Sequence, residues 1–521
     1  MAEPPVDPGL VSVHAPQESC LGSRRDLNGG IEADDLRERL DEALAIIKSQ
    51  QALIDTLRAE LLTVRGELQE ARAEAQAVRG ELQEARTEIQ ELRARLGRDS
   101  SNSSKPPSSD APYQAPEQRR KKGRKRGGQP GQGGQHRALV EANVFEIIKP
   151  ATCEDCGAHL RGEDVRPWRH QVTEVPELTA HVTEYVVHTL SCPCGATTRG
   201  VLPAGVSRGA FGPRLQAMVA VCSGAYRLSK RSIVSLLADF FGVHLSLGSI
   251  ANLEAATSTA LVAPFQEAIA KVRDARVLHA DETHWRVDKR TVWMWVAVTV
   301  AAVIYFIRPR RDAAAAKELV SPGFSGILVS DQYNGYHWLH TERRQFCWAH
   351  LLRHFRELLD YGDEAKALGE RLLGATERMF EAWHKSRRRA ISWKEFLVQV
   401  APIRVEVGEL LRQGTVATSK HARAMCKGLL RRELSLWTFT RRSGVEPTNN
   451  AAERALRHAV MWRKTSFGSD SERGLRFAER ILTVVATLRR QQRSVLEFVA
   501  AACRNTLAHT QPPLLFLPAG A

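Results

Sequence analysis

Residues 36 to 96 carry apolar side chains in a strict alternation of four and three residues, which is broken only at Gln50. Leucine and isoleucine dominate one of the two seams, and smaller residues fill the other. The segment from Val64 to Arg72 recurs without change from Val78 to Arg86. A repeat every 3.5 residues keeps one stripe of a helix facing a partner, so the pattern predicts a coiled coil roughly 90 Å long. A lone solvated helix is the alternative, but the long register favours a homodimer.

A linker and a basic tract follow this repeat. Residues 97 to 118 hold six serines and four prolines, a composition that cannot bury a core. Residues 119 to 137 hold eight lysines or arginines and no acid, and so supply over half of the net charge of +15. Such a ribbon can neutralise DNA phosphates, although a merely solvated tail has the same composition. The predicted DNA contacts in it are Arg119, Arg120, Lys121, Lys122, Arg124, Lys125 and Arg126.

Two cysteine pairs, each followed directly by a glycine, predict a small metal-binding module. Four thiolates can build a tetrahedral structural zinc site that replaces a core. The second pair has one intervening residue where the first has two, so His170 or His188 is an alternative ligand, and buried cysteines without metal are the other interpretation. The predicted Zn²⁺ ligands are Cys153, Cys156, Cys192 and Cys194. Nine cysteines in so long a chain do not suit a disulfide scaffold and indicate a reducing, cytoplasmic compartment.

The region from residue 206 to residue 272 has a helical period. A stretch from Leu228 to Phe241 is followed by Gly242 and by a second stretch from about Leu247. Two helices about a glycine turn fit a helix-turn-helix that reads a major groove, and they fit a plain helical hairpin equally well.

The longest apolar run, from Val292 to Ile307, has 16 residues and contains Thr299. A bilayer needs about 20 apolar residues, so a membrane span is excluded. The tryptophans and valines of the run suit a pair of strands that is buried on both faces.

Two short strand-like runs each end in an aspartate. Asp281 ends the first, and Asp331 ends the second after an alanine-rich stretch, 312 to 320, that can form a crossover helix. Aspartates at the ends of neighbouring strands can share hard cations such as Mg²⁺. Each aspartate alone is equally compatible with a strand-end cap or a turn.

A third carboxylate, Glu453, borders an apolar stripe on a predicted helix. Leu456 and Val460 lie three and seven residues further on, so Glu453 can point along the packed face. Asn450 with Glu453 three residues later also resembles a capping box, which would make the glutamate structural. The local sequence leaves the two interpretations even.

Four blocks of residues occur together in a characteristic order. They are Asp281-Glu282-Thr283, Ser330-Asp331-Gln332-Tyr333, Cys347-Trp348-Ala349-His350 and Pro447-Thr448-Asn449-Asn450-Ala451-Ala452-Glu453-Arg454. Upstream stand the tract 102–110, the glycine-rich tract 127–131 and the cysteine pairs. From about residue 36 to residue 500 the chain resembles the transposases of IS66-type bacterial insertion sequences.

The resemblance implies a ribonuclease-H-like catalytic core with a DDE triad, carried by Asp281, Asp331 and Glu453. It favours catalysis over capping for Glu453. The triad would hold two Mg²⁺ ions, for which Mn²⁺ can substitute. The basic block 462–469 is similar to the family's block at that place, so Arg463 and Lys464 are predicted to contact DNA, with an exposed basic loop as the alternative.

The predicted fold class is multidomain α+β. The predicted parts are a disordered N-terminus (1–35), a coiled coil (36–96), a linker with the basic tract (97–140), a zinc-ribbon-like module (141–205), a helix-turn-helix-like DNA-binding region (206–272), the first part of a ribonuclease-H-like α/β core (273–354), a helical insertion (355–445), and the last part of the core with C-terminal helices (446–521).

The function implied by the resemblance is cleavage and strand transfer of double-stranded DNA. The DNA partners would be the terminal inverted repeats and target DNA, and accessory proteins of the same element are further expected partners. A coiled-coil, zinc-containing DNA-binding regulator without enzymatic activity would explain residues 36 to 260 equally well, and a host nuclease with the same core would cut DNA without joining it.

Overall fold

The computed structural model of the chain describes residues 33–96, 138–288, 290–466 and 468–517. The predicted disordered N-terminus before residue 33 and the basic tract with its seven predicted DNA contacts lie outside these ranges. The chain divides into two units, Met1–Ile89 and Gln90–Ala521, and each is described by itself.

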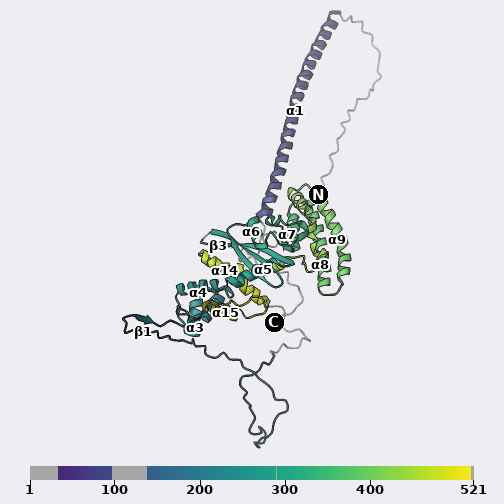
Figure 1. The fold of residues 1–521 in the computed structure, drawn as a ribbon. Coiled ribbons are helices and arrows are strands. Elements are labelled where there is room, and N and C mark those ends of the chain that lie inside the picture. Colours follow the sequence, from purple (N-terminus) through teal and green to yellow (C-terminus); the bar gives the residue numbers. More distant parts are fainter. Residues whose placement is uncertain (1–32, 97–137, 289, 467, 518–521) are drawn as a thin grey trace. The chain divides into compact units, whose positions relative to one another are not determined.

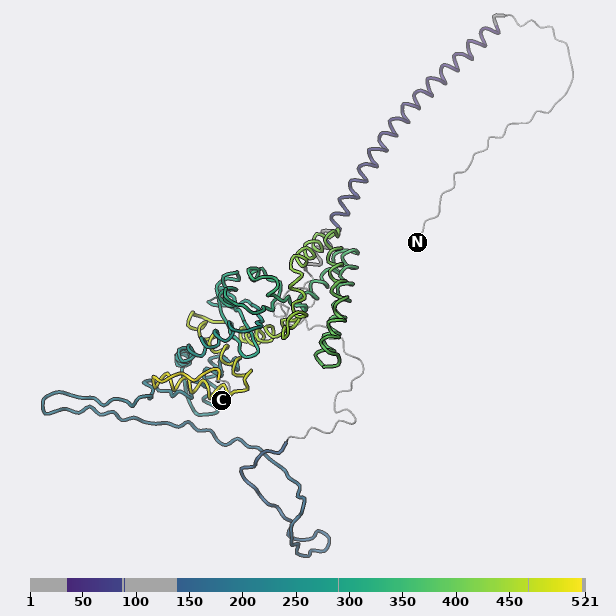
Figure 2. Tube along the Cα trace, turned by 45° about the vertical axis from the view of Figure 1, so that its right-hand side comes forward, coloured from purple at the N-terminus to yellow at the C-terminus, as the bar shows by residue number. Residues whose placement is uncertain are grey.

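The first unit is dominated by a long helix, α1 (Ala33–Leu96), which Figure 2 shows as one unbroken coil. The predicted N-terminal helix is therefore confirmed. Its apolar seam is exposed, with Ile54 at 43% and Leu61 at 57%. A helix with an exposed apolar face gains little stabilisation from tertiary packing.

In the second unit, the described chain after residue 137 is largely extended and carries two tight turns. The first lies at Cys153, whose backbone carbonyl accepts a hydrogen bond from the Gly157 amide at 3.0 Å. The second lies between the antiparallel strands β1 (Thr189–Ser191) and β2 (Thr197–Arg199). Gly157 and Gly195 have φ angles of 72° and 88°, which explains why a glycine follows each cysteine pair.

Four helices precede the central sheet: α2 (Pro213–Gly224), α3 (Lys230–Phe241), α4 (Leu247–Ala260) and α5 (Val262–Arg273). Ser229 and Ser246 cap α3 and α4 by accepting hydrogen bonds from backbone amides three residues later. Gly242 ends α3 in the left-handed conformation, as a glycine turn requires. One face of α4 packs on α2 and on the C-terminal helices.

The sheet, of which β3 is labelled in Figure 1, has five strands in the order β5-β4-β3-β6-β7. They are β3 (Val277–Val287), β4 (Arg290–Val298), β5 (Val303–Arg308), β6 (Ile327–Ser330) and β7 (Arg344–Phe346). The first three pair antiparallel, and β6 and β7 continue parallel to β3. Thr299 turns the chain between β4 and β5 by accepting a hydrogen bond from the Ala302 amide at 2.9 Å, so the long apolar run is a buried strand pair.

The crossover from β5 to the parallel strand β6 runs through α6 (Ala313–Val320), which Asp312 caps by accepting a hydrogen bond from the Ala315 amide. In the parallel pairing of β3 with β6, each residue lies opposite the one 50 positions later, as Val277 does with Ile327 and His279 with Val329. Continued by two residues, this register places Asp281 level with Asp331.

Three C-terminal helices complete this part of the fold: α13 (Asn450–Ser466), α14 (Glu472–Arg490) and α15 (Val495–Leu507). Helix α13 packs on β3 and β4, and α14 packs on β5. Side chains of α14 cap the free edge of β5: Glu479, Thr483 and Thr487 accept hydrogen bonds from the amides of alternate strand residues at 2.6, 3.0 and 3.1 Å. Four helical residues rise about 6 Å, which nearly matches two strand residues, so edge and helix stay in register.

A helical region is inserted between β7 and α13 and has its own core. Its helices are α7 (Trp348–Glu357), α8 (Asp363–Arg387), α9 (Trp393–Gly414), α10 (Lys420–Leu430), α11 (Glu433–Leu436) and α12 (Thr438–Arg441). Large buried side chains such as Phe355, Phe396 and Trp437 fill the space between them. The chain is thus a mixed α+β protein, and its helical insertion follows the last strand of the sheet in the sequence. Across the described part of the chain, no helix is long and apolar enough to cross a membrane.

Candidate functional site

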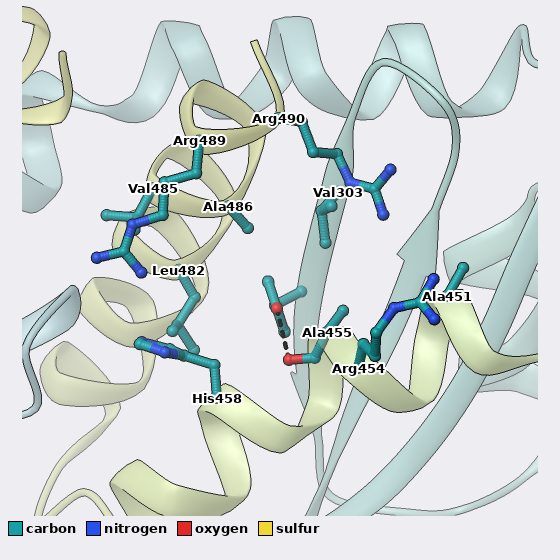
Figure 3. Close-up of a pocket in the computed structure, with 11 residues that line it drawn as sticks. Val303, Ala451, Arg454, Ala455, His458, Leu482, Val485, Ala486, Arg489 and Arg490 are labelled. Carbon is teal, nitrogen blue, oxygen red and sulfur yellow. Dashed lines mark hydrogen bonds between the residues drawn. The ribbon is translucent and has the colours of Figure 1, made fainter. Parts of the chain in front are cut away.

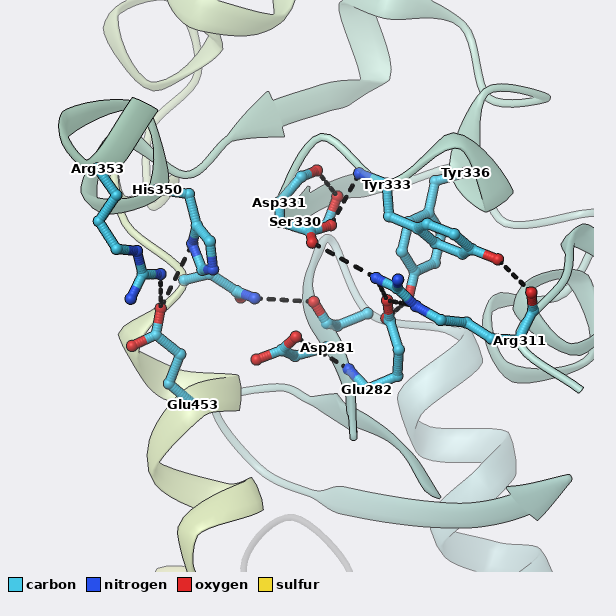
Figure 4. A network of polar contacts seen from close by, with 12 residues as sticks. Asp281, Glu282, Arg311, Ser330, Asp331, Tyr333, Tyr336, His350, Arg353 and Glu453 are labelled. Atoms are coloured by element: carbon cyan, nitrogen blue, oxygen red, sulfur yellow. Dashed lines mark hydrogen bonds and ion pairs between the residues drawn. The ribbon is translucent and has the colours of Figure 1, made fainter. Parts of the chain in front are cut away.

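Three predicted carboxylates gather where β6 ends beside the middle of β3 (Figure 4). Asp281 lies within β3, Asp331 follows the last residue of β6, and Glu453 lies in the first turn of α13. Asp281 interacts electrostatically with both of the other carboxylates. Asp281 therefore lies near residues that are 50 and 172 positions further along the chain.

Asn449 joins the helix of Glu453 to the strand of Asp281. Its side chain is fully buried and donates a hydrogen bond to the Ala280 carbonyl at 2.8 Å, and its carbonyl oxygen lies 3.3 Å from the ring of His279. The backbone N–H of Asn449 donates a hydrogen bond to the Cys347 sulfur at 3.1 Å. The Cys347 amide in turn donates to the Ser330 carbonyl at 2.9 Å. This chain of contacts fixes the start of α13 against β3 and the end of β6.

The charge of Asp281 is poorly compensated. Its carboxyl group is buried, and burial raises its pKa well above the ordinary value. Repulsion from Glu282 and Asp331, and more weakly from Glu453, acts in the same direction. A carboxylate in such surroundings ionises readily only when a cation joins it.

Glu282 is a fourth carboxylate that the sequence analysis did not select. Arg311 donates to it at 2.6 and 2.8 Å, and the Tyr336 hydroxyl donates at 3.2 Å. Burial and repulsion from Asp331 raise the pKa of Glu282 to about 7, although Arg311 opposes the shift. Arg311 also lies 3.9 Å from Asp331, so one guanidinium links two acidic side chains.

Arg344 supports the loop that carries Asp331. It is fully buried in β7 and donates hydrogen bonds to the Ser330 hydroxyl at 3.0 Å and to the Asp331 carbonyl at 3.1 Å. Burial lowers the pKa of its guanidinium to about 10. Two of its nitrogens have no hydrogen-bond partner, so it adds positive potential beneath the carboxylates.

Glu453 lies against the start of the helical insertion. One of its carboxylate oxygens is 3.6 Å from the Nδ1 atom of His350 and 4.0 Å from Arg353 (Figure 4), and that oxygen has no hydrogen-bond partner. Burial, followed by repulsion from Arg353, lowers the pKa of His350 to about 3, so the imidazole is neutral. These contacts lead away from the helix N-terminus and give the capping-box interpretation no support.

The donor atoms divide into two overlapping sets. Single donor atoms of Cys347, His350 and Glu453 lie within 4.8 Å of one another, and this is the compact metal-compatible group among the described residues. Asp281 and Asp331 lie beside that group without joining it. Burial raises the pKa of the Cys347 thiol to about 12, and the thiol already accepts the Asn449 amide hydrogen bond.

The residues present fit a divalent cation. Carboxylate oxygens are the donors that Mg²⁺ prefers, the buried Asp281 lacks a counter-charge, and a Glu453 oxygen lacks a partner. Residues Asp281, Asp331 and Glu453 would hold such an ion, with Arg311 and Arg344 behind them.

The structure brings the cysteines together as two separate pairs. Contact with Cys156 and nearby backbone amides lowers the pKa of Cys153, and the Ala196 backbone and Cys192 lower the pKa of Cys194. The two pairs do not form one compact group of donors in the described structure. The four-cysteine zinc site stays a prediction.

The two predicted DNA contacts after the glutamate differ from each other. Arg463 is only 7% exposed, and its guanidinium donates to the Thr283 hydroxyl and to the His284 carbonyl of β3. This differs from the expected phosphate contact, because the side chain is used to join α13 to the sheet. Lys464 is exposed and makes no such contact with β3 among the described residues.

Comparison with known proteins bears on this arrangement. Residues 208–477, about half of the chain, match the family described as "Transposase IS66 family". The chain belongs to the IS66 transposase family. Residues 51–138 match a family of unknown function (DUF6444). The chain is also 28% identical over 391 residues to the uncharacterized protein y4hP of Sinorhizobium fredii, and the match covers 67% of this chain and 69% of that protein.

The segment that matches the IS66 family contains all three predicted carboxylates and the whole helical insertion. Sequence reasoning missed Glu282, Arg311, Arg344 and Asn449 as parts of this site. Glu282 and Asn449 stood inside the blocks that carried the resemblance, so a signal was present for them. Arg311 lies in the connection between β5 and α6, and Arg344 lies in the short buried strand β7, so only the fold shows what they face.

Proposed function

We propose that this member of the IS66 transposase family is a DDE enzyme that cleaves the ends of its element and joins them to target DNA. The observation that carries the proposal is the convergence of Asp281, Asp331 and Glu453, with Asp281 electrostatically coupled to both others. Acidic side chains within one strand, just after its neighbouring strand and on a packed helix suit phosphoryl transfer on a polyanion.

The residues of the chain would bind the cations, position the carboxylates and balance the charge of the site. Asp281, Asp331 and Glu453 would hold two Mg²⁺ ions, which Mn²⁺ can replace; when bound, they supply activation of the attacking oxygen and stabilisation of the departing 3′ oxygen. Asn449 keeps Glu453 at the level of Asp281, and Arg344 fixes the loop of Asp331. His350 and Arg353 hold the Glu453 side chain from the insertion.

The experiment combines the purified chain with labelled duplexes that end in the terminal inverted repeats of its element, with and without Mg²⁺ or Mn²⁺. We expect cation-dependent nicks at the element ends and products joined to a second duplex. Cleavage without joined products would favour a host nuclease. Binding without cleavage under any of these conditions would favour a regulator and contradict the proposal.

We further propose that α1 pairs with a second copy of the chain. Its apolar residues keep one register along the helix, and the side chains described in that seam are exposed, including Leu40 at 60% and Leu68 at 49%. A parallel two-stranded coiled coil would bury this seam by packing each apolar side chain between four residues of the partner.

Replacing Ile54 and Leu61 together by lysine should convert the dimer to a monomer. The two charges would lie in the pairing seam, where burial of an unpaired ammonium is strongly unfavourable. Light scattering after gel filtration should give twice the 57.9 kDa chain mass for the parent and a single chain mass for the variant. Lysines at Thr56 and Thr63, outside the seam, are the control; a parent that is monomeric at micromolar concentration would contradict the pairing.

The remaining partner assignments rest on sequence. The basic tract from Arg119 to Arg126 and the exposed Lys464 are proposed to contact DNA, and Cys153, Cys156, Cys192 and Cys194 are proposed to bind structural Zn²⁺. Accessory proteins of the same element are proposed as further partners.

A further inference from the structure

A basic pocket lies beside the first half of α13, on a different face of that helix from Glu453. Its volume is about 240 Å³, and it opens between α13, α14 and the start of β5. Arg454, Arg489, Arg490 and His458 contribute the polar groups, and Val303, Tyr305, Leu482, Val485 and three alanines form the floor. Figure 3 shows Arg454 and Arg490 on one side of the pocket and Arg489 with His458 on the other.

The positive charge of the pocket is not neutralised by the protein. No acidic side chain lines it, and no carboxylate is paired with Arg454 or Arg490 among the described residues. Burial, and then repulsion from the nearby guanidinium group of Arg454, lower the pKa of Arg490. His458 is already engaged, because its ring contacts the Gly224 carbonyl at 2.9 Å and Arg227 at 3.1 Å. A ligand for this pocket must therefore bring negative charge.

The sheet register relates the pocket to the carboxylates. Tyr305 lies opposite Val296 of β4, and Val296 lies opposite Asp281, so the three residues share one row and one face of the sheet. Two strand spacings place Tyr305 about 10 Å from Asp281. The Tyr305 hydroxyl donates a hydrogen bond to the Ala455 carbonyl at 2.9 Å. This contact fixes α13 between the pocket and the carboxylates.

We infer that this pocket binds a backbone phosphate of the DNA strand whose cleavage is proposed above, and the inference rests on that proposed function. The guanidinium forks of Arg454 and Arg490 match the geometry of a phosphate. A strand that passes the N-terminal end of α13 reaches the pocket from the carboxylates, and the helix dipole favours an anion along this path. Since Tyr305 and Asp281 are only about 10 Å apart, the bound phosphate lies within a few nucleotides of the scissile one.

The test compares binding of the full chain to an element-end duplex without divalent cations across a series of salt concentrations. Arg454→Gln with Arg490→Gln should weaken binding by about tenfold or more. It should also reduce the slope of log affinity against log salt by about 0.9, the value for one lost phosphate contact. Arg504→Gln, an exposed arginine on α15, is the matched control and should change neither quantity.

A second double variant distinguishes the loss of phosphate binding from misfolding. Arg454→Lys with Arg490→Lys keeps the charge but not the fork, so it should retain the salt slope while losing part of the affinity. Ethylation of single phosphates should show one position near the element end that impairs binding of the parent and not of the double glutamine variant.

The inference is overturned if the glutamine pair, folded by circular dichroism, matches the Arg504 control in affinity, slope and ethylation pattern. It is equally overturned if millimolar inorganic phosphate abolishes the difference between parent and variant while the ethylation patterns stay identical, since the pocket then takes a free anion. Because no cleavage is measured, a parent that binds DNA but never cuts it would end the proposed function and leave these results intact.

Discussion

Replacing Asp281 by asparagine is expected to reduce strand cleavage by at least about a thousandfold while DNA binding stays within twofold. The asparagine keeps the shape of the side chain but removes the central negative charge of the site. Loss of several kcal/mol of metal-assisted stabilisation corresponds to three or more factors of ten in rate. Cleavage of an element-end duplex with saturating Mg²⁺, followed by gel electrophoresis, measures the effect.

The same substitution should make the metal-free protein more stable. Burial raises the pKa of Asp281 in the folded chain, so the folded state bears a cost of ionisation that grows as the pH rises above about 4, the value for an unfolded aspartate. Asparagine removes that cost. Denaturant unfolding at pH 7 should therefore shift to higher concentration in the variant, and the shift should shrink toward pH 4.

Asp274→Asn is the matched control, because this exposed aspartate lies three residues before β3. It should change neither cleavage nor unfolding. Cleavage by the Asp281 variant at the rate of the parent would show that the assignment of the triad is wrong. Lower stability with lost cleavage would instead point to a structural role for Asp281.

Replacing Asn449 by alanine is expected to lower both stability and cleavage. The Ala280 carbonyl would lose its partner in a fully buried place, and a small cavity would remain, at a combined cost of about 2–4 kcal/mol. The start of α13 would no longer be fixed to β3, and a displacement of about 1 Å at Glu453 would reduce the cleavage rate about a hundredfold.

Asn450→Ala separates this effect from a general loss of helix stability, since Asn450 is the exposed first residue of α13. Denaturant unfolding and single-turnover cleavage should both be near the values of the parent for this control. If the Asn449 variant cleaves DNA normally despite a clear loss of stability, the contact between Asn449 and β3 is not needed to position Glu453 for cleavage.

Much of the site could be predicted from the sequence, because the apolar residues of strands and helices repeat at short, characteristic spacings. The runs before Asp281 and Asp331 predicted buried strands, and the alanine-rich stretch before Asp331 predicted the crossover helix α6. The role of Glu453 could not be decided in this way, because a packed helical position and a capping box use the same spacing. The contacts of Glu453 with His350 and Arg353 cross between segments a hundred residues apart.

Arg463 shows the opposite error. A basic residue in a basic block reads as a phosphate contact, yet its guanidinium is buried against β3. Local sequence reports charge, and it does not report which side of a helix is covered by the sheet.

The sequence by itself determined the helical rod of α1, the strands that carry or precede the two aspartates and the family, because each depends on residues close together in the chain or on blocks in order. The prediction that Asp281 ends its strand was wrong, because β3 pairs with β4 as far as Val287. Only the tertiary structure decided that Glu282, Arg311, Arg344 and Asn449 surround the carboxylates, and that Arg454 and Arg490 gather at one pocket without a carboxylate partner among the described residues. The physical reason is that burial and charge compensation are properties of neighbours in space, and those neighbours come from strands and helices that the chain joins only when it folds.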